Sequence, residues 1–137
     1  MNTRIDTETD RSVEATARAY IETVGARELS PLESLLSDTL VATFAAGTSD
    51  KGEWIEALRR LLPVLVRNDI SEIYTRGPRA CVVYDFVTDT SGGAVRCVEL
   101  LTVVDGRIEE IELLLDRVAF APVRQALEER ARSASGS

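Results

Sequence analysis

The sequence predicts a single α+β domain in which a curved antiparallel sheet wraps around helices. Two observations carry this prediction: helical periodicity dominates the first half of the chain, and four extended segments separated by turn residues follow it. Helices first and a meander of strands afterwards are typical of the α+β class. The chain of 137 residues has the length of one domain, and it shows no internal repeat and no linker.

A first amphipathic helix is predicted over residues 13–25, after a polar lead at residues 1–12. Its apolar side chains recur at the spacing of one helical face, and Gly25 is a stop signal. These side chains are Val13, Ala17, Tyr20, Ile21 and Val24. Tyr20 is therefore expected on the face that turns toward the core.

Two more helices and a strand are predicted next. A short helix begins at Ser30 and Pro31, which suit the cap and the first turn. Residues 39–47, TLVATFAAG, have the composition of a strand. Asp50 then opens a capping box, and the apolar spacing after it predicts a third helix that Pro63 disturbs or closes.

From Asp69 onward the pattern changes from helical to extended. Four strands are predicted, within the segments ISEIYTRG, ACVVYDFVTDT, AVRCVELLTVV and RIEEIELLLD. Gly92 with Gly93, and Asp105 with Gly106, are hairpin turn signals between them. A last helix is predicted from Val118 to about residue 132, and residues 133–137 form a flexible tail. The domain proper thus covers residues 13–132.

Composition excludes several classes of function. The net charge of −7, with no run of Lys or Arg, argues against nucleic acid and anionic membranes as partners. There is no histidine and there are only two cysteines, so we expect no metal, no cofactor and no chemistry that needs an imidazole. No apolar stretch approaches the roughly 20 residues that span a bilayer, and the polar start lacks a signal-peptide hydrophobic region. A cytoplasmic location is therefore expected.

The order of helix, short helix, strand, helix and four-stranded meander, closing on DGRIEEIELLLD, resembles the NTF2-like superfamily and in particular its SnoaL-like, ketosteroid-isomerase-like branch. The resemblance covers about residues 13–127. It implies a cone-shaped, cystatin-like fold around an apolar pocket, with an outer sheet face that often supports a homodimer. The branch includes ketosteroid isomerases, polyketide cyclases, epoxide hydrolases and small-molecule binders, so the fold alone does not assign chemistry.

The resemblance to ketosteroid isomerases implies roles for individual residues. Such an enzyme uses a helix tyrosine and a protonated acid on a late strand as donors to an oxyanion. These positions correspond to Tyr20 and Glu99, whereas the position of the catalytic base falls on or beside Phe44. A base would have to approach from a loop, from Asp38, Asp50 or Asp69. The residues that epoxide hydrolases need are replaced by apolar or small ones, so epoxide hydrolysis is not expected.

The direction of Glu99 decides between a pocket and a solvated face. A two-residue turn at Gly92 and Gly93 places Glu99 opposite Phe86, and Leu101 opposite Tyr84. At Asp105 and Gly106, a two-residue turn pairs Glu99 with Glu112 in water, while a three-residue loop with a bulge pairs it with Ile111 in the pocket. In the pocket, desolvation would raise the Glu99 pKa. The family geometry favours the pocket and the turn preference favours solvent, so both alternatives stay open.

The candidate site therefore combines two catalytic candidates with an apolar lining. The catalytic candidates are Tyr20 and Glu99, and the predicted ligand-binding residues are Phe44, Trp54, Tyr84, Phe86, Cys97, Leu101, Ile111 and Leu113. The expected function is binding of a hydrophobic small molecule with a carbonyl or phenol oxygen, with isomerisation or cyclisation through an enolate-like intermediate as the possible chemistry. The alternative is a ligand-binding or dimerisation domain without catalysis.

Overall fold

The structure is a computed structural model that describes residues 3–135 and, within them, the side chains of residues 11–134. It has the mixed α+β architecture that the sequence predicts. In chain order its elements are α1 (Thr3–Gly25), α2 (Leu32–Leu35), β1 (Leu36–Phe44), β2 (Gly47–Ser49), α3 (Lys51–Leu61), β3 (Leu65–Arg76), β4 (Arg79–Thr88), β5 (Ala94–Val104), β6 (Arg107–Leu115) and α4 (Arg117–Ser135).

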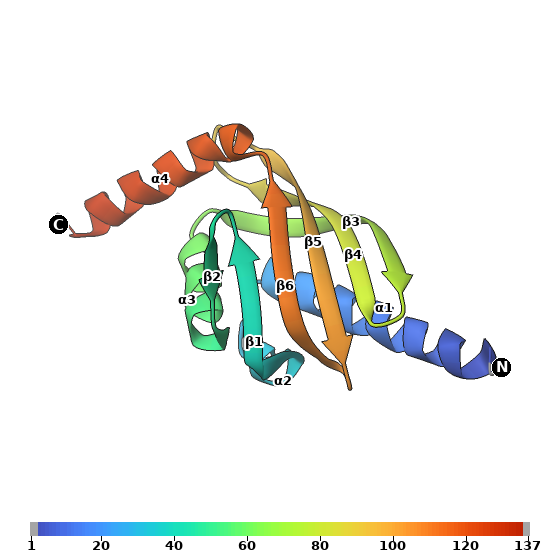
Figure 1. Cartoon of the computed structure of the whole chain (residues 1–137). Helices are drawn as coiled ribbons and strands as arrows, with labels where there is room; N and C mark the ends of the chain where they lie inside the picture. The colour runs from blue at the N-terminus through green and yellow to red at the C-terminus, as the bar shows by residue number, and fades with distance from the viewer. Residues whose placement is uncertain (1–2, 136–137) are drawn as a thin grey trace.

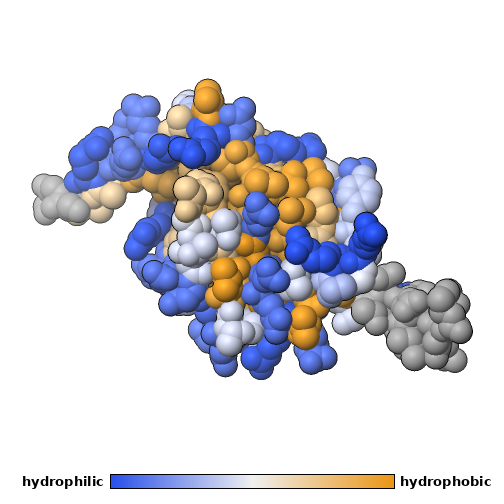
Figure 2. All heavy atoms as spheres, viewed as in Figure 1, coloured by the Kyte–Doolittle hydropathy of each residue, from blue (hydrophilic) through white to orange (hydrophobic). Residues whose placement is uncertain are grey.

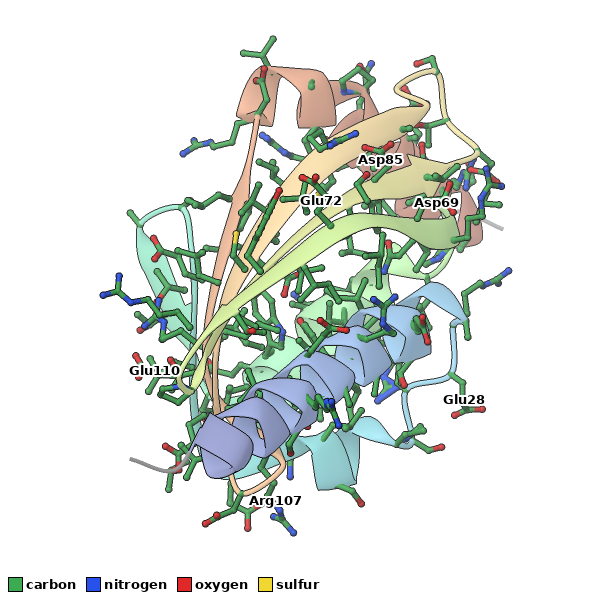
Figure 3. All side chains as sticks on the ribbon, turned by 90° about the vertical axis from the view of Figure 1, so that its right-hand side faces the viewer. Glu28, Asp69, Glu72, Asp85, Arg107 and Glu110 are labelled. Atoms are coloured by element: carbon green, nitrogen blue, oxygen red, sulfur yellow. The ribbon has the colours of Figure 1, made fainter. Side chains whose placement is uncertain are left out.

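The strands form one curved, open sheet in the order β2-β1-β6-β5-β4-β3. All neighbouring strands are antiparallel except β1 and β6, which run parallel, so the sheet is not antiparallel throughout as predicted. Helix α1 crosses behind the sheet (Figure 1), and the strands arch over it when the molecule is turned by 90° (Figure 3). One face of the sheet therefore encloses the core with α1, and the other face is turned outward.

The core follows from the alternation of side chains along β4 and β5. In both strands every second residue is buried, because successive side chains point to opposite faces of a sheet. These residues meet the apolar face of α1 that the sequence predicts, from Val13 to Val24. Among the buried residues of the described part, Glu99 is the only one with an ionisable carboxyl group, and its exposed fraction is 3%.

Several element boundaries differ from the predicted ones. The backbone of α1 is helical from Thr3 and that of α4 continues to Ser135, so helix includes most of the predicted lead and part of the predicted tail. Strand β1 begins at Leu36, where it already pairs with Ile108 of β6. This early start depends on a partner strand far along the chain, which local periodicity does not reveal. The division into lead, domain and tail stays a prediction.

The loop that connects β4 and β5 is longer than predicted, and the prediction of a two-residue turn at Gly92 and Gly93 is wrong. Thr88 still bonds to Gly93, with its backbone N–H 3.0 Å and its hydroxyl 2.7 Å from the Gly93 carbonyl oxygen. The turn therefore spans residues 89–92. This register pairs Glu99 with Val82 instead of Phe86, and Leu101 with Ala80 instead of Tyr84. The shift is an even number of residues, so each side chain keeps its predicted face.

None of the helices in the described part of the chain is long and apolar enough to cross a membrane.

Candidate functional site

Glu99 lies on the inner face of the sheet, through a register that neither predicted alternative describes. Asp105 and Gly106 do form a two-residue turn, with positive φ angles of 51° and 75°. A bulge then shifts the β5–β6 pairing between Thr102 and Val103, and Glu99 is paired with Leu113, not with Glu112 or Ile111. The tight turn and the bulge therefore occur together. The extra residue, Glu109, lies on β6, so the bulge places Leu113 instead of Glu112 opposite Glu99, while the unbroken alternation along β5 points Glu99 inward.

A short chain of hydrogen bonds surrounds the buried carboxyl group. The Tyr84 hydroxyl donates to Oε1 of Glu99 over 2.6 Å. The indole Nε1–H of Trp54 donates to the Tyr20 hydroxyl oxygen over 3.0 Å, and the Tyr20 hydroxyl in turn interacts with Glu99. Oε2 of Glu99 is buried and has no hydrogen-bond partner among the described residues. The arrangement thus leaves one oxygen of the carboxyl group unsatisfied.

The start of α3 positions Trp54 in this chain. Asp50 and Glu53 form the predicted capping box, in which each side chain accepts a hydrogen bond of 2.9 Å from the backbone N–H of the other. The box fixes the first turn of the helix, and Trp54 follows it directly. Tyr20 comes from the buried face of α1. The contact between Trp54 and Tyr20 therefore joins α3 to α1 at the inner face of the sheet.

Burial dominates the electrostatics of the site. Desolvation raises the pKa of Glu99 from 4.5 to about 7, and the hydrogen bond from Tyr84 and the nearby Tyr20 hydroxyl only partly oppose it. Burial also holds the pKa of both tyrosine hydroxyls well above 10, and the nearby Glu99 charge adds to this. The thiol of Cys97 has its pKa raised to about 12 for the same two reasons. At neutral pH Glu99 is the group whose protonation changes.

A cavity of about 170 Å³ lies against this cluster. It is lined by Tyr20, Ile21, Val24, Phe44, Trp54, Ala57, Leu58, Leu61, Asn68, Tyr84, Phe86, Cys97, Glu99, Leu113, Leu115 and Phe120. The lining contains no Lys or Arg, so no cation compensates the Glu99 charge there. Apolar walls with a few polar groups are typical of small-molecule sites.

Helix α4 contributes one wall of the cavity through Phe120. The rings of Phe120 and Phe86 lie 6.4 Å apart at an angle of 57°. Arg130 holds the helix to the body, since its guanidinium donates to the Pro63 carbonyl oxygen and pairs with Asp89, both over 2.8 Å. The cavity is thus bounded by α1, α3, the sheet and α4.

The structure brings most of the predicted site residues together, but not all of them. Tyr20, Glu99, Phe44, Trp54, Tyr84, Phe86, Cys97 and Leu113 line the cavity. Leu101 and Ile111 do not; they pair with each other across β5 and β6 and are buried in the core. Tyr84 was predicted as lining only, and it also donates the short hydrogen bond to Glu99.

Sequence reasoning missed half of the lining. The missed residues are Ile21, Val24, Ala57, Leu58, Leu61, Asn68, Leu115 and Phe120. Most of the helical ones share an apolar helix face with Tyr20 or Trp54, so helical periodicity could have found them. Asn68 and Phe120 come from β3 and α4, and only the tertiary structure brings them to the cavity.

None of the three carboxylates that were expected to approach from a loop as a base is part of the cavity lining, and two of them, Asp38 and Asp69, lie on strands β1 and β3. Asp38 pairs with Lys51 over 3.0 Å, Asp50 caps α3, and Asp69 pairs with Arg67 over 3.0 Å. All three are exposed. Glu99 is therefore the only carboxylate among the residues that line the cavity.

Comparison with known proteins identifies the fold. No protein-family model and no curated protein matches the sequence. A protein from Kribbella flavida DSM 17836 is similar in structure with 26% identity, over 84% of this chain and 95% of that chain, at a TM-score of 0.71. A steroid delta-isomerase from Pseudomonas aeruginosa matches with 16% identity over 92% of this chain and 96% of that chain, at a TM-score of 0.71. A candidate SnoaL-like polyketide cyclase from Jannaschia sp. CCS1 matches with 13% identity over 82% and 91% of the two chains, at a TM-score of 0.70. This chain has the NTF2-like fold, in the form shared by SnoaL-like cyclases and ketosteroid isomerases.

Proposed function

We propose that the cavity binds one apolar small molecule and that neutral Glu99 donates a hydrogen bond to a carbonyl or phenol oxygen of this ligand. The observation that carries the proposal is the buried, unpartnered Oε2 of Glu99, a residue of the apolar cavity lining. An unsatisfied buried polar atom is costly, and a ligand oxygen at this place would remove the cost.

The hydrogen bonds around Glu99 support its role as a donor. Tyr84 already donates to Oε1, so the proton of the neutral acid belongs on Oε2. With a pKa of about 7, Glu99 is neutral in a large fraction of the molecules at neutral pH. Tyr84 is then a positioning residue that orients the carboxyl group.

Tyr20 is proposed as a second donor to the same ligand oxygen. Its oxygen accepts from Trp54, which leaves its own proton available for Glu99 or for the ligand. Two donors aimed at one oxygen in an apolar site stabilise negative charge that develops there. The site could therefore stabilise an enolate as well as bind a ketone.

Catalysis by proton transfer is the second candidate function, and the near-neutral pKa of Glu99 favours it. Because the cavity lining contains no other carboxylate, Glu99 itself must act as the base, in its ionised form. It would take a proton from the carbon next to the ligand carbonyl, and the electron pair would move to the oxygen facing Tyr20. Return of the proton from Glu99 to another carbon of the enolate completes an isomerisation. In a cyclisation the enolate carbon attacks a second carbonyl of the ligand, and the alkoxide formed from that carbonyl takes the proton back from Glu99.

A homodimer through the outer sheet face is part of the proposal. Figure 2 shows apolar side chains gathered over the face that points away from α1. Leu114, Val98 and Val83 form an apolar row there, since Leu114 pairs with Val98 and Val98 with Val83. Leu114 is 47% exposed, so Leu114→Asp should leave the fold intact and convert a dimer to a monomer in sedimentation velocity. An unchanged sedimentation coefficient would argue against this face. The cytoplasmic location stays a prediction.

The binding proposal is tested with Trp54, the only tryptophan of the chain and part of the cavity wall. Its fluorescence is titrated with a panel of planar apolar enones between pH 5.5 and 8.5. Wild-type affinity should fall above pH 7, because the ionised carboxylate no longer donates. Glu99→Gln should bind with little pH dependence, and Glu99→Ala should bind at least tenfold more weakly, about 1.4 kcal/mol.

Glu110→Gln is the matched control, since Glu110 is an exposed acid on β6. It should keep both the affinity and the pH dependence of the wild type. Equal binding by the wild type and Glu99→Ala at every pH would contradict the proposal.

A further inference from the structure

Asn68, a residue of the cavity lining, carries a second unpartnered polar atom. Asn68 belongs to β3 and is one of the cavity-lining residues. Its Nδ2 donates to the Ile21 carbonyl oxygen over 3.1 Å. Its Oδ1 is buried and has no hydrogen-bond partner among the described residues. The side chain thus offers one free acceptor.

The position of Asn68 is fixed on two sides. The bond from Nδ2 to Ile21 ties the amide to α1 and determines which atom is the free oxygen. At the end of α1, a Cβ on Gly25 would lie 2.8 Å from the Asn68 backbone nitrogen and 3.0 Å from its Cβ. The helix and the strand are therefore in close contact at Asn68. A free acceptor on a side chain that a hydrogen bond to α1 already orients is suited to selecting a ligand.

Asn68 and Glu99 are separated along the sheet. Asn68 pairs with Phe86, and Glu99 pairs with Val82, so their partners on β4 are four residues apart. At about 3.3 Å per residue this is about 13 Å along the strand. The two side chains therefore start from different parts of the sheet, and Tyr84 and Cys97 of the cavity lining lie on the strands between them.

We propose that Asn68 accepts a hydrogen bond from a hydroxyl or N–H group of the ligand whose carbonyl or phenol oxygen binds Glu99. The ligand class is then an elongated apolar molecule with an acceptor at one end and a donor at the other, such as a hydroxylated enone. The inference rests on the proposed function. It adds a specificity-determining residue, because a buried acceptor left unpaired disfavours every ligand that lacks the donor.

The test uses pairs of enones that are identical except for one hydroxyl group at the end away from the carbonyl, with the hydroxyl at different positions across the series. Affinities are measured from Trp54 fluorescence on the wild type, Asn68→Leu and Asn68→Asp. The wild type should bind at least one hydroxylated enone ten times or more tightly than its partner without the hydroxyl. Asn68→Leu should reduce this ratio to about one, and Asn68→Asp should also lower it, because a carboxylate cannot donate to the Ile21 carbonyl oxygen that holds the side chain in place.

The ratio within each variant separates specificity from structure. A general disturbance of the cavity lowers both affinities and leaves their ratio unchanged, and Phe86→Leu, at the position paired with Asn68, provides this control. A wild type without any hydroxyl preference, or a preference that Asn68→Leu retains, would overturn the inference. A hydroxyl preference that depends on Asn68 while Glu99→Ala has no effect on any enone would instead overturn the proposed function alone. An absence of binding throughout the series overturns both.

Discussion

Acidic side chains on the inner and outer faces of the sheet have opposite surroundings. Asp85 on the outer face of β4 pairs with Arg96 of β5 over 2.8 Å and stays partly in water. Glu99 on the inner face of β5 has two tyrosine hydroxyls and no cation. Figure 3 shows Asp85, Asp69 and Glu72 on the side of the strands away from α1. Burial makes the inner carboxylate of Glu99 costly to stability, whereas the outer carboxylate of Asp85 costs little. A buried carboxylate with a perturbed pKa is a sign of function.

The largest expected difference between the faces is the effect of pH on stability. The Glu99 pKa is raised to about 7 in the folded protein from an ordinary value of 4.5, so the folded state holds the proton more tightly. Stability is therefore lost as pH rises from about 4.5 to about 7, by about 3 kcal/mol in total. Glu99→Gln should remove this loss in urea unfolding at a series of pH values. Glu110→Gln should leave it in place, and a wild-type curve without it would contradict the assigned burial.

A matched pair of valines compares packing on the two faces. Val82 is fully buried on the inner face of β4, and its neighbour Val83 is half-buried on the outer face. Val82→Ala should destabilise the protein by about 1.6 kcal/mol, from about 0.8 kcal/mol for each buried methylene. Val83→Ala should cost clearly less in the monomer. Equal losses in the free energy of unfolding, measured by chemical denaturation, would show that Val83 on the outer face is as buried as Val82.

Removal of the Tyr84 hydroxyl group tests whether Tyr84 positions Glu99 on the inner face. Tyr84→Phe deletes the hydrogen bond to Glu99 and should cost about 1–2 kcal/mol at pH 8, where Glu99 is ionised. Because this bond lowers the Glu99 pKa, its loss should move the pH midpoint of enone binding upward. The fluorescence titration measures the midpoint directly. A midpoint that stays in place would mean that Tyr84 does not position the carboxyl group.

The smallest effect is expected from the ion pair on the outer face. Asp85→Asn should change the free energy of unfolding by less than about 1 kcal/mol, because the pair is partly exposed. The change should shrink at high salt, where exposed charges are screened. Enone affinity should not change. A loss of enone binding in Asp85→Asn would mean that the outer ion pair influences the cavity, and it would contradict the separation of the two faces.

The comparison also explains what the sequence could predict. The family resemblance favoured an inward Glu99 and the turn preference favoured solvent, so the sequence left its direction open, and neither predicted hairpin register is the one in the structure. An error of an even number of residues at the β4–β5 turn kept every side chain on its face. The bulge near Thr102 could not be read from the residues Asp105 and Gly106, whose turn is formed as their preferences dictate.

The parts that sequence reasoning missed depend on contacts between distant segments. Phe120 lines the cavity because Arg130 and the turn at residues 89–92 seat α4 on the body. Gly92 permits this, since a Cβ there would lie 3.0 Å from a methyl group of Val123. Asn68 faces α1 through a pairing between β3 and β4 that begins earlier in the chain than the predicted strand. No local pattern carries this information.

The most direct test of the central claim is the titration of the Glu99 side-chain carboxyl carbon by NMR, assigned with Glu99→Gln. The account predicts a midpoint near pH 7 in the free protein. The midpoint should move upward when an enone is bound, because the ligand favours the neutral acid that donates to it. A midpoint near 4.5, or one that the ligand leaves unchanged, would contradict the claim that a buried neutral Glu99 binds the ligand.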